Sequence, residues 1–99
     1  MKITAKTAAK ADAYRLHRIT TPEELEMKMM HNGGVVITFG DRILIAGYYY
    51  RPDGNCYYAA IYRFTTADHT IEGTVQLVKI SNDSFIDNGH AIAWAMKQK

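Results

Sequence analysis

Tyrosine is the residue type in this sequence whose number and spacing best suit recognition chemistry. Six of the seven tyrosines lie close together in the chain: Tyr48, Tyr49, Tyr50, Tyr57, Tyr58 and Tyr62. A tyrosine side chain offers a large, rigid contact surface with a polar tip and is enriched in protein interfaces. On an exposed sheet, aromatic rings also stack on unpaired bases. The cluster therefore indicates a binding surface, although strand propensity and core packing alone explain Tyr48, Tyr58 and Tyr62.

Residues suited to catalysis or metal binding are sparse. The four histidines are scattered, and the one cysteine, Cys56, has no cysteine neighbour at the short spacing of a zinc site. Cys56 fits a small, half-buried apolar position better than a nucleophile. Asp68 and His69 are adjacent in an expected loop, where neighbouring side chains diverge. The phosphate-binding patterns G-x-G-x-x-G and G-x-x-x-x-G-K-S/T are absent. We therefore expect a protein that is not an enzyme and that has neither a cofactor nor a metal site.

Positive charge is concentrated in residues 1–20. The basic residues there outweigh the single acidic Asp12, and they are Lys2, Lys6, Lys10, Arg15 and Arg18. Such a segment could bind phosphates, but lysines spaced four apart on a helix more often form a solvated face. The whole chain has a formal net charge of +2, which is too small to indicate a nucleic-acid partner from bulk electrostatics.

The chain has the size and composition of one domain, spanning residues 1–99. Hydrophobic residues make up 47% and charged residues 22%, which is ordinary for a globular protein and unlike a disordered one. No repeat, low-complexity tract or linker divides the sequence. The lone cysteine needs no oxidising compartment, and no apolar run suits a signal peptide or a membrane span. We therefore expect a cytoplasmic protein.

Three segments have the sequence signals of helices. Residues 4–17 are rich in alanine, although the alternation over residues 13–19 also fits a strand. The next helix is expected over residues 22–31, because Thr21 suits the cap and Glu24 follows it by three residues. Residues 84–98 have the apolar spacing of an amphipathic helix. Within this last segment, Gly89 marks either close packing against the sheet or a later helix start at Asn88.

The middle of the chain is predicted to form a four-stranded antiparallel meander, over residues 35–39, 42–50, 56–64 and 70–80. These runs are rich in β-branched and aromatic residues and are separated by residues that favour turns. The fold class is therefore expected to be α+β, with the N-terminal helices and the C-terminal amphipathic helix packed on the meander.

The turns of this meander also predict its register. Gly40-Asp41 suits a two-residue hairpin turn, and residues 51–55 suit a type I turn whose first and last residues pair. In that register Leu44 lies opposite Ile37 on one side and opposite Tyr62 on the other. One sheet face then collects the expected core: Val35, Ile37, Phe39, Leu44, Ala46, Tyr48, Tyr58, Ala60, Tyr62 and Phe64, with Ile71, Val75 and Leu77 of the fourth strand.

The opposite face is the predicted interaction surface. The same register sets Tyr49 opposite Tyr57, in line with Ile45 and Ile61 and near Arg63. If helices cover only the core face, four aliphatic side chains and two tyrosines are left exposed on this face, and a contiguous apolar patch of that kind is rare on a monomer without a use. The competing interpretation is a three-layer domain, in which the N-terminal helix covers this face.

Two functions fit these patterns. The first is a small non-enzymatic protein-binding module or inhibitor, such as an accessory protein of a phage or mobile element. Its partner would be another protein or a second copy of the chain. The alternative is a single-stranded nucleic-acid-binding protein that uses sheet tyrosines and arginines. The residues 51–58 do not match the basic, glycine-rich strand pattern of an RNA-recognition sheet, and no membrane partner is expected.

Overall fold

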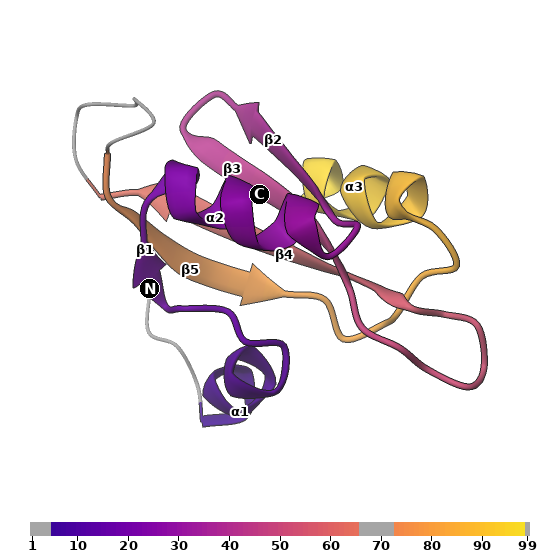
Figure 1. Cartoon of the computed structure of the whole chain (residues 1–99). Coiled ribbons are helices and arrows are strands. Elements are labelled where there is room, and N and C mark those ends of the chain that lie inside the picture. Colours follow the sequence, from indigo (N-terminus) through magenta and orange to yellow (C-terminus); the bar gives the residue numbers. More distant parts are fainter. Residues whose placement is uncertain (1–4, 66–72, 99) are drawn as a thin grey trace.

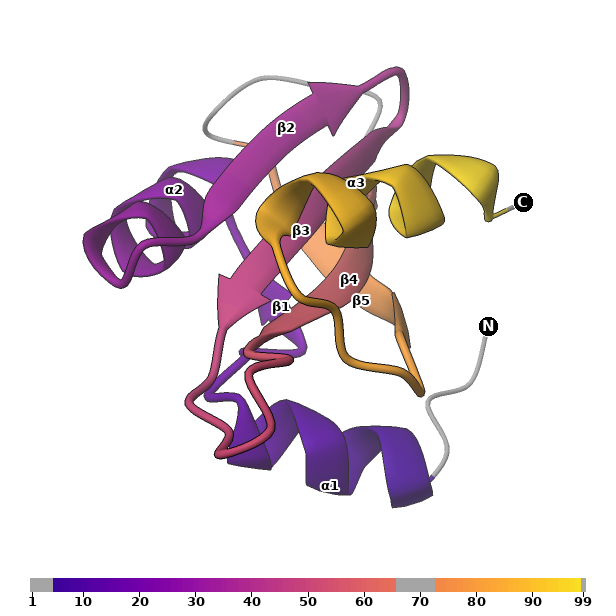
Figure 2. The same cartoon turned by 90° about the vertical axis from the view of Figure 1, so that its right-hand side faces the viewer.

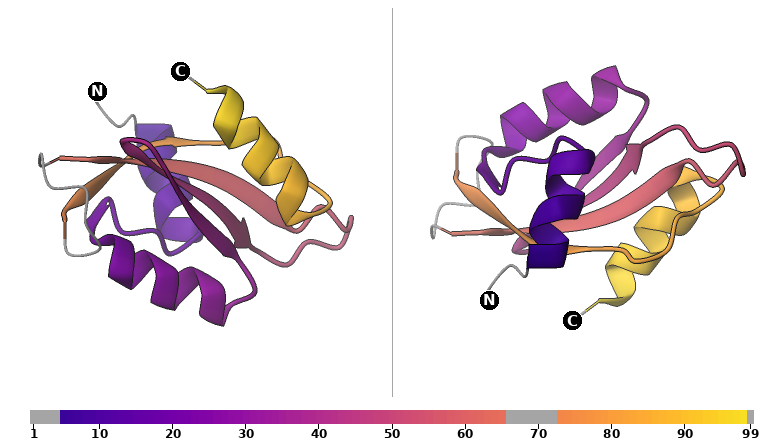
Figure 3. Two further views of the ribbon diagram at one scale, coloured as in Figure 1. Left: turned by 90° about the horizontal axis from the view of Figure 1, so that it is seen from above. Right: turned by 90° about the horizontal axis from the view of Figure 1, so that it is seen from below.

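The computed structural model describes residues 5–65 and 73–98, which form an α+β fold in three layers (Figure 1). A central antiparallel sheet has two helices on one face and one helix on the other (Figure 3). The elements in chain order are α1 (Ala5–Ala13), β1 (Ile19–Thr20), α2 (Pro22–His31), β2 (Val35–Phe39), β3 (Arg42–Tyr48), β4 (Tyr57–Phe64), β5 (Val75–Ile80) and α3 (Asn88–Lys97).

The sheet has the order β1-β5-β4-β3-β2, so that β2 to β5 form the predicted meander. The prediction of four strands is wrong by one. The short strand β1 pairs with β5, so the described part of the chain has five strands. The predicted fourth strand is observed as β5, with Phe64 opposite Val75. Residues 66–72, and with them Asp68, His69 and Ile71, lie outside the described residues.

The first hairpin has the predicted register, with Phe39 opposite Arg42 and Ile37 opposite Leu44. In the second hairpin the prediction is wrong by one residue, because Leu44 lies opposite Ile61 and not opposite Tyr62. A shift of one residue turns every side chain of one strand to the other face of the sheet. The tyrosines of β4 therefore lie on the opposite face from the one that the turn chemistry predicted.

The reason for the shift lies in where the turn closes. Gly54 has the expected left-handed conformation, with a φ of 85°, and its N–H donates to the carbonyl of Arg51 at 3.2 Å. The turn therefore closes between Arg51 and Gly54, and not between Arg51 and Asn55 as predicted. The strands continue from this closure without a break, since the N–H of Tyr49 donates to the carbonyl of Cys56 at 2.7 Å and Tyr48 lies opposite Tyr57.

Both faces of the sheet are covered, so the prediction of one open face is wrong and the competing three-layer interpretation is confirmed. Beneath α1 and α2 lie the buried residues Ile43, Ile45, Tyr58, Ala60, Tyr62, Val75 and Leu77. Beneath α3 lie Leu44, Ala46, Ala59 and Ile61. The apolar side chains of β3 and β4 are thus divided between two cores.

The helix starts follow the sequence signals. Thr21 caps α2 by accepting the N–H of Glu24, as predicted. The side chain of Asp87 caps α3 by accepting the N–H of His90 at 2.8 Å. Because α3 begins at Asn88, the later start is the correct interpretation of Gly89. None of the described helices is long and apolar enough to cross a membrane.

Candidate functional site

The structure separates the five residues of the predicted interaction surface. Ile45 is 0% exposed and packs with the core under α2, whereas Ile61 is 3% exposed and packs under α3. Tyr57 is half-buried against the α3 core. Tyr49 and Arg63 are exposed, but they belong to opposite faces of the sheet because of the shifted register. These residues therefore form no single patch.

A different set of tyrosines comes together where α1 ends beside the β3–β4 hairpin. The rings of Tyr14 and Tyr58 are stacked, with centroids 4.0 Å apart and an interplanar angle of 2°. The ring of Tyr49 meets Tyr14 edge-on at 5.2 Å. Tyr58 is buried, Tyr14 is half-buried and Tyr49 is exposed. We call these three residues the tyrosine stack, and it leads from the core to the surface.

Tyr58 anchors the stack from below. It lies opposite Gly47 in β3, and its hydroxyl donates to the Sδ of Met29 in α2 at 3.6 Å. Burial raises the pKa of Tyr58, and the neighbouring Tyr14 raises it further, so this phenol stays neutral at physiological pH. The anchor is therefore uncharged and held in position, and the more exposed members of the stack are left for contact with a ligand.

Arg15 follows the stack at the end of α1, in an unusual backbone conformation. Its φ of 59° is left-handed, and it is the position after a helix where glycine is common. The N–H of Leu16 donates to the carbonyl of Ala11 at 2.8 Å, and the N–H of Arg15 donates to Asp12 at 3.1 Å. These two hydrogen bonds are those of a Schellman motif. Glycine would adopt this conformation with less strain.

Two adjoining hollows open beside the stack, and we call them together the tyrosine groove. The larger has a volume of about 610 Å³ and is lined by the tyrosine stack with Tyr48 and Tyr50. The smaller has a volume of about 420 Å³ and lies between α2 and the segment that connects α1 to β1. Both hollows are lined by Arg15, Lys28, Met29 and Asn32. The groove therefore runs past two cations.

These cations have no ionic partner among the described residues. The side chains of Arg15 and Lys28 are exposed, and neither takes part in an ion pair within residues 5–65 and 73–98. Among the residues that the structure describes, the one carboxylate lining the groove belongs to Glu24, and it accepts a hydrogen bond from the hydroxyl of Thr20 at 2.6 Å. The groove thus combines aromatic rings with two free positive charges.

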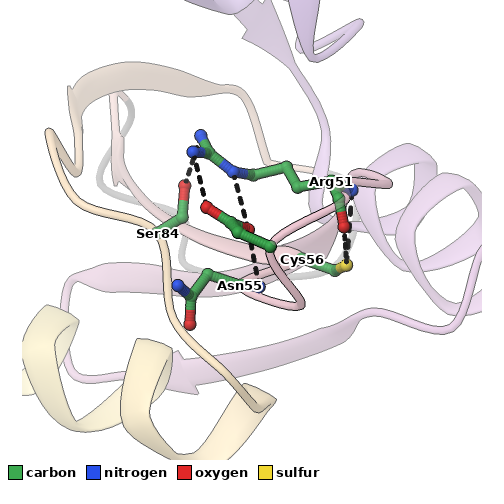
Figure 4. Close-up of polar contacts among 5 residues, drawn as sticks. Arg51, Asn55, Cys56 and Ser84 are labelled. Carbon is green, nitrogen blue, oxygen red and sulfur yellow. Dashed lines mark hydrogen bonds and ion pairs between the residues drawn. The ribbon is translucent and has the colours of Figure 1, made fainter.

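The loop of the β3–β4 hairpin is held by its own polar contacts (Figure 4). The Nη2 of Arg51 lies 2.9 Å from the Oδ2 of Asp53, while the Oδ1 of Asp53 accepts the N–H of Asn55. The hydrogen bond from Arg51 is the main cause that lowers the pKa of Asp53. Arg51 also donates to the Oγ of Ser84 at 3.4 Å. The sulfur of Cys56 contacts the backbone of Arg51, so this cysteine has a structural contact in the loop.

A further pair of titratable residues lies at the start of α3. The Nδ1 of His90 lies 2.7 Å from the Oδ1 of Asp87, and both side chains are exposed. Hydrogen bonds from His90, first from its backbone N–H and then from its ring, lower the pKa of Asp87. The pair is explained by helix capping. Within the described residues, no three His, Cys, Asp or Glu side chains are grouped as a metal site would need.

The sequence patterns did not indicate Tyr14, Arg15 or Lys28 as parts of one site. Tyr14 is the single tyrosine outside the hairpin cluster, and Arg15 was grouped with the lysines of the basic N-terminal segment. The spacing of four between Lys28 and Asn32 could have placed these two residues on one helix side. Their meeting with Tyr14 depends on how α1 and α2 pack, and no sequence signal reports that.

The chain matches the model of one protein family over residues 16–99, and the family is described as nucleotide modification associated domain 4 (Nmad4). No curated protein and no solved structure matches the chain. The matched range includes β1 to β5, α2 and α3. It therefore contains Lys28, Tyr49 and Tyr58 of the tyrosine groove, whereas Tyr14 and Arg15 precede it.

Proposed function

The chain belongs to the nucleotide modification associated domain 4 family, and from this premise we propose that it is a non-enzymatic module that binds an unpaired nucleotide in the tyrosine groove. The observation that carries this proposal is the shared hollow of the tyrosine stack, Arg15 and Lys28. A nucleotide has an aromatic base and an anionic phosphate, and the groove offers a partner for each.

The base is expected to stack on the exposed part of the tyrosine stack. Tyr49 is 47% exposed, and Tyr14 behind it holds its ring in an edge-on contact. Stacking of a base on an aromatic side chain contributes about 1–3 kcal/mol and tolerates any base. A base inside a duplex is already stacked on both faces. The groove therefore favours a nucleotide that is unpaired, either free or within a single strand.

The phosphate is expected to bind to Arg15 and Lys28. Both side chains are exposed and have no ionic partner among the residues that the structure describes. Arginine donates to a phosphate through two parallel N–H groups, and lysine acts as a point charge. The local pair of cations matters here more than the total charge of +2. The larger hollow, at about 610 Å³, is in the size range of small-ligand sites.

The test is a titration of the whole chain with a deoxynucleoside monophosphate and with a short single-stranded oligonucleotide, followed by tyrosine fluorescence. We expect both Arg15→Ala and Lys28→Ala to weaken binding at least about tenfold, because each removes one phosphate contact. For the oligonucleotide, each substitution should also reduce the salt slope by about 0.7. Lys97→Ala is the matched control, since Lys97 is an exposed cation at the end of α3, on the other face of the sheet.

The two ligands distinguish the source of the nucleotide. Equal affinity for the monophosphate and for each nucleotide unit of the oligonucleotide indicates a free nucleotide, whereas binding of the oligonucleotide alone indicates a single strand. Two results reject the proposal. One is that neither ligand binds at millimolar concentration, and the other is that Lys97→Ala weakens binding as much as Lys28→Ala does.

The hypothesis of a protein-binding module, with a phage or mobile element as its source, stays a prediction. The surface that the sequence suggested for it is divided between two cores, with Ile45 and Ile61 buried on opposite faces. A protein contact therefore needs a different surface.

A further inference from the structure

The edge strand β2 presents a surface that the tyrosine groove does not use. β2 pairs with β3 along one side, and no strand of the described residues pairs with its other side. Figure 2 shows β2 at the border of the sheet, with α2 on one side and α3 on the other. The opposite border is formed by the two residues of β1. β2 is therefore the longer free edge of the sheet.

The hairpin geometry determines which backbone groups of β2 point outward. In a two-residue hairpin the residues that flank the turn, here Phe39 and Arg42, form a hydrogen-bonded pair. Hydrogen-bonded pairs alternate with non-hydrogen-bonded pairs along an antiparallel ladder. The backbone N–H and C=O groups of Val35, Ile37 and Phe39 therefore form their hydrogen bonds with β3. The N–H and C=O groups of Val36 and Thr38 then point away from the sheet. These four groups are the ones available to a further strand.

β2 also lacks the features that protect edge strands from pairing. Such strands usually carry a lysine, a proline or a bulge. The sequence of β2 is Val-Val-Ile-Thr-Phe, and its pairing with β3 is regular. Ile37 is 39% exposed and Phe39 is 47% exposed. An uncharged, regular and apolar edge of this kind is suited to pairing with another strand.

We propose that β2 pairs with β2 of a second copy of this chain, antiparallel and with Ile37 on the two-fold axis. In this register Val36 of one copy lies opposite Thr38 of the other, so all four outward groups of each strand find partners. Ile37 meets its own counterpart in a close, non-hydrogen-bonded pair, and Phe39 lies opposite Val35. The strand is thus complementary to itself, as a two-fold interface requires.

Methionines of both helix layers extend this interface. Lys28 of α2 lines the tyrosine groove, and Met30, two residues later, therefore points to the other side of the helix, toward the β2 edge. Trp94 of α3 lies on the β5 side of the helix, because the Nζ of Lys79 in β5 is 5.5 Å from the centre of its ring. Met96 comes two residues later and therefore lies on the other side of α3, toward β2. Met30 is 63% exposed and Met96 is 53% exposed.

The helices bring the interface closer to the size of a stable dimer. A five-residue strand pair alone falls short of the roughly 1,200 Å² that specific interfaces bury. Because α2 covers β2 and β3, the two copies of α2 would lie about 10 Å apart on the joined sheet, given a strand spacing of about 4.8 Å. That is the packing distance of neighbouring helices. The view onto the β2 edge in Figure 3 shows α2 and α3 flanking it.

Cysteine cross-linking of the whole chain tests both the pairing and its register. In a Cys56→Ser background, Ile37→Cys places two thiols across the two-fold axis, within the Cα distance of a disulfide. We expect nearly complete covalent dimer under mild oxidation. Phe39→Cys is the matched control, because its two thiols would lie four residues out of register and about 13 Å apart. Equal cross-linking of the two variants, or none in Ile37→Cys, rejects this pairing.

Sedimentation of the unmodified chain gives the second measurement. We expect a dimer at concentrations of tens of micromolar, and a monomer with native circular dichroism for Ile37→Lys. Ile19→Lys should leave the dimer intact, because Ile19 is 63% exposed on the opposite edge of the sheet. A monomeric wild-type chain at millimolar concentration, or a dimer that only Ile19→Lys dissociates, overturns the proposal.

Discussion

The ring of Tyr58 lies directly over Gly47, its cross-strand neighbour. A Cβ atom at Gly47 would lie 2.1 Å from the Cζ and 2.3 Å from the hydroxyl oxygen of Tyr58. Only a residue without a side chain therefore allows this ring to cross β3, reach Met29 in α2 and stack on Tyr14. A glycine in the middle of a strand usually weakens it, and here the ring occupies the space that it leaves.

Gly47→Ala is expected to destabilise the protein by about 1–3 kcal/mol, because the new methyl group displaces a buried ring from a packed core. Chemical unfolding measures this change. Gly89→Ala is the matched control, since its new Cβ would meet only the Oδ1 of Asp87, at 3.5 Å. In the helix α3 this second change should stabilise the protein by about 0.5–1 kcal/mol. Equal stability of Gly47→Ala and wild type would contradict the position of Tyr58.

Arg15→Gly is expected to change stability and binding in opposite directions. Glycine adopts the left-handed conformation at this position without strain, so the free energy of unfolding should rise by about 1 kcal/mol. Nucleotide affinity should fall, because the guanidinium is lost. Arg15→Lys keeps both the charge and the strain, and its stability should equal that of wild type. A loss of stability in Arg15→Gly would show that the arginine side chain supports the fold.

Tyr49→Ser and Tyr57→Ser are expected to separate binding from stability. Tyr49 is 47% exposed beside the groove, so its loss should weaken nucleotide binding and change stability by less than about 0.5 kcal/mol. Tyr57 is half-buried under α3, and its ring meets Tyr48 at 5.6 Å. Its loss should cost about 2 kcal/mol of stability and leave binding unchanged. Thermal unfolding and the nucleotide titration give the two readouts, and the reverse pattern would contradict both assignments.

The cap of α3 is expected to make stability depend on pH in the acidic range. Hydrogen bonds from His90 lower the pKa of Asp87 in the folded state below its unfolded value of about 3.9. A carboxylate with a lowered pKa contributes stability above the unfolded pKa and loses that contribution as the pH falls through the folded pKa. Asp87→Ala should therefore be less stable than wild type at neutral pH.

The difference between Asp87→Ala and wild type should shrink as the pH is lowered through this range, and urea unfolding at several pH values measures it. Asp87→Asn is the control, because an amide oxygen still accepts the capping hydrogen bond but does not titrate there. A difference between wild type and Asp87→Ala that stays constant down to pH of about 2 would show that the carboxylate charge contributes nothing.

The sequence by itself determined the features that depend on neighbours in the chain. The cap at Thr21, the turn at Gly54 and the first hairpin register all follow from residues a few positions apart. Hydrophobic alternation correctly placed β2, β3 and β4, because strand formation needs only that pattern and good turns. The α+β class follows from the same local signals.

Only the tertiary structure decided which residues share a face and which form the groove. The β3–β4 turn closes between Arg51 and Gly54 and not between Arg51 and Asn55, which shifted the register by one residue and moved Tyr57 and Tyr58 to the faces opposite those expected. Because side chains alternate along a strand, an error of one residue at a turn changes every contact beyond it. The groove joins Tyr14 and Arg15 to Lys28 through the packing of two helices on one sheet face. That packing is a long-range balance of buried surfaces, which no local pattern in the chain encodes.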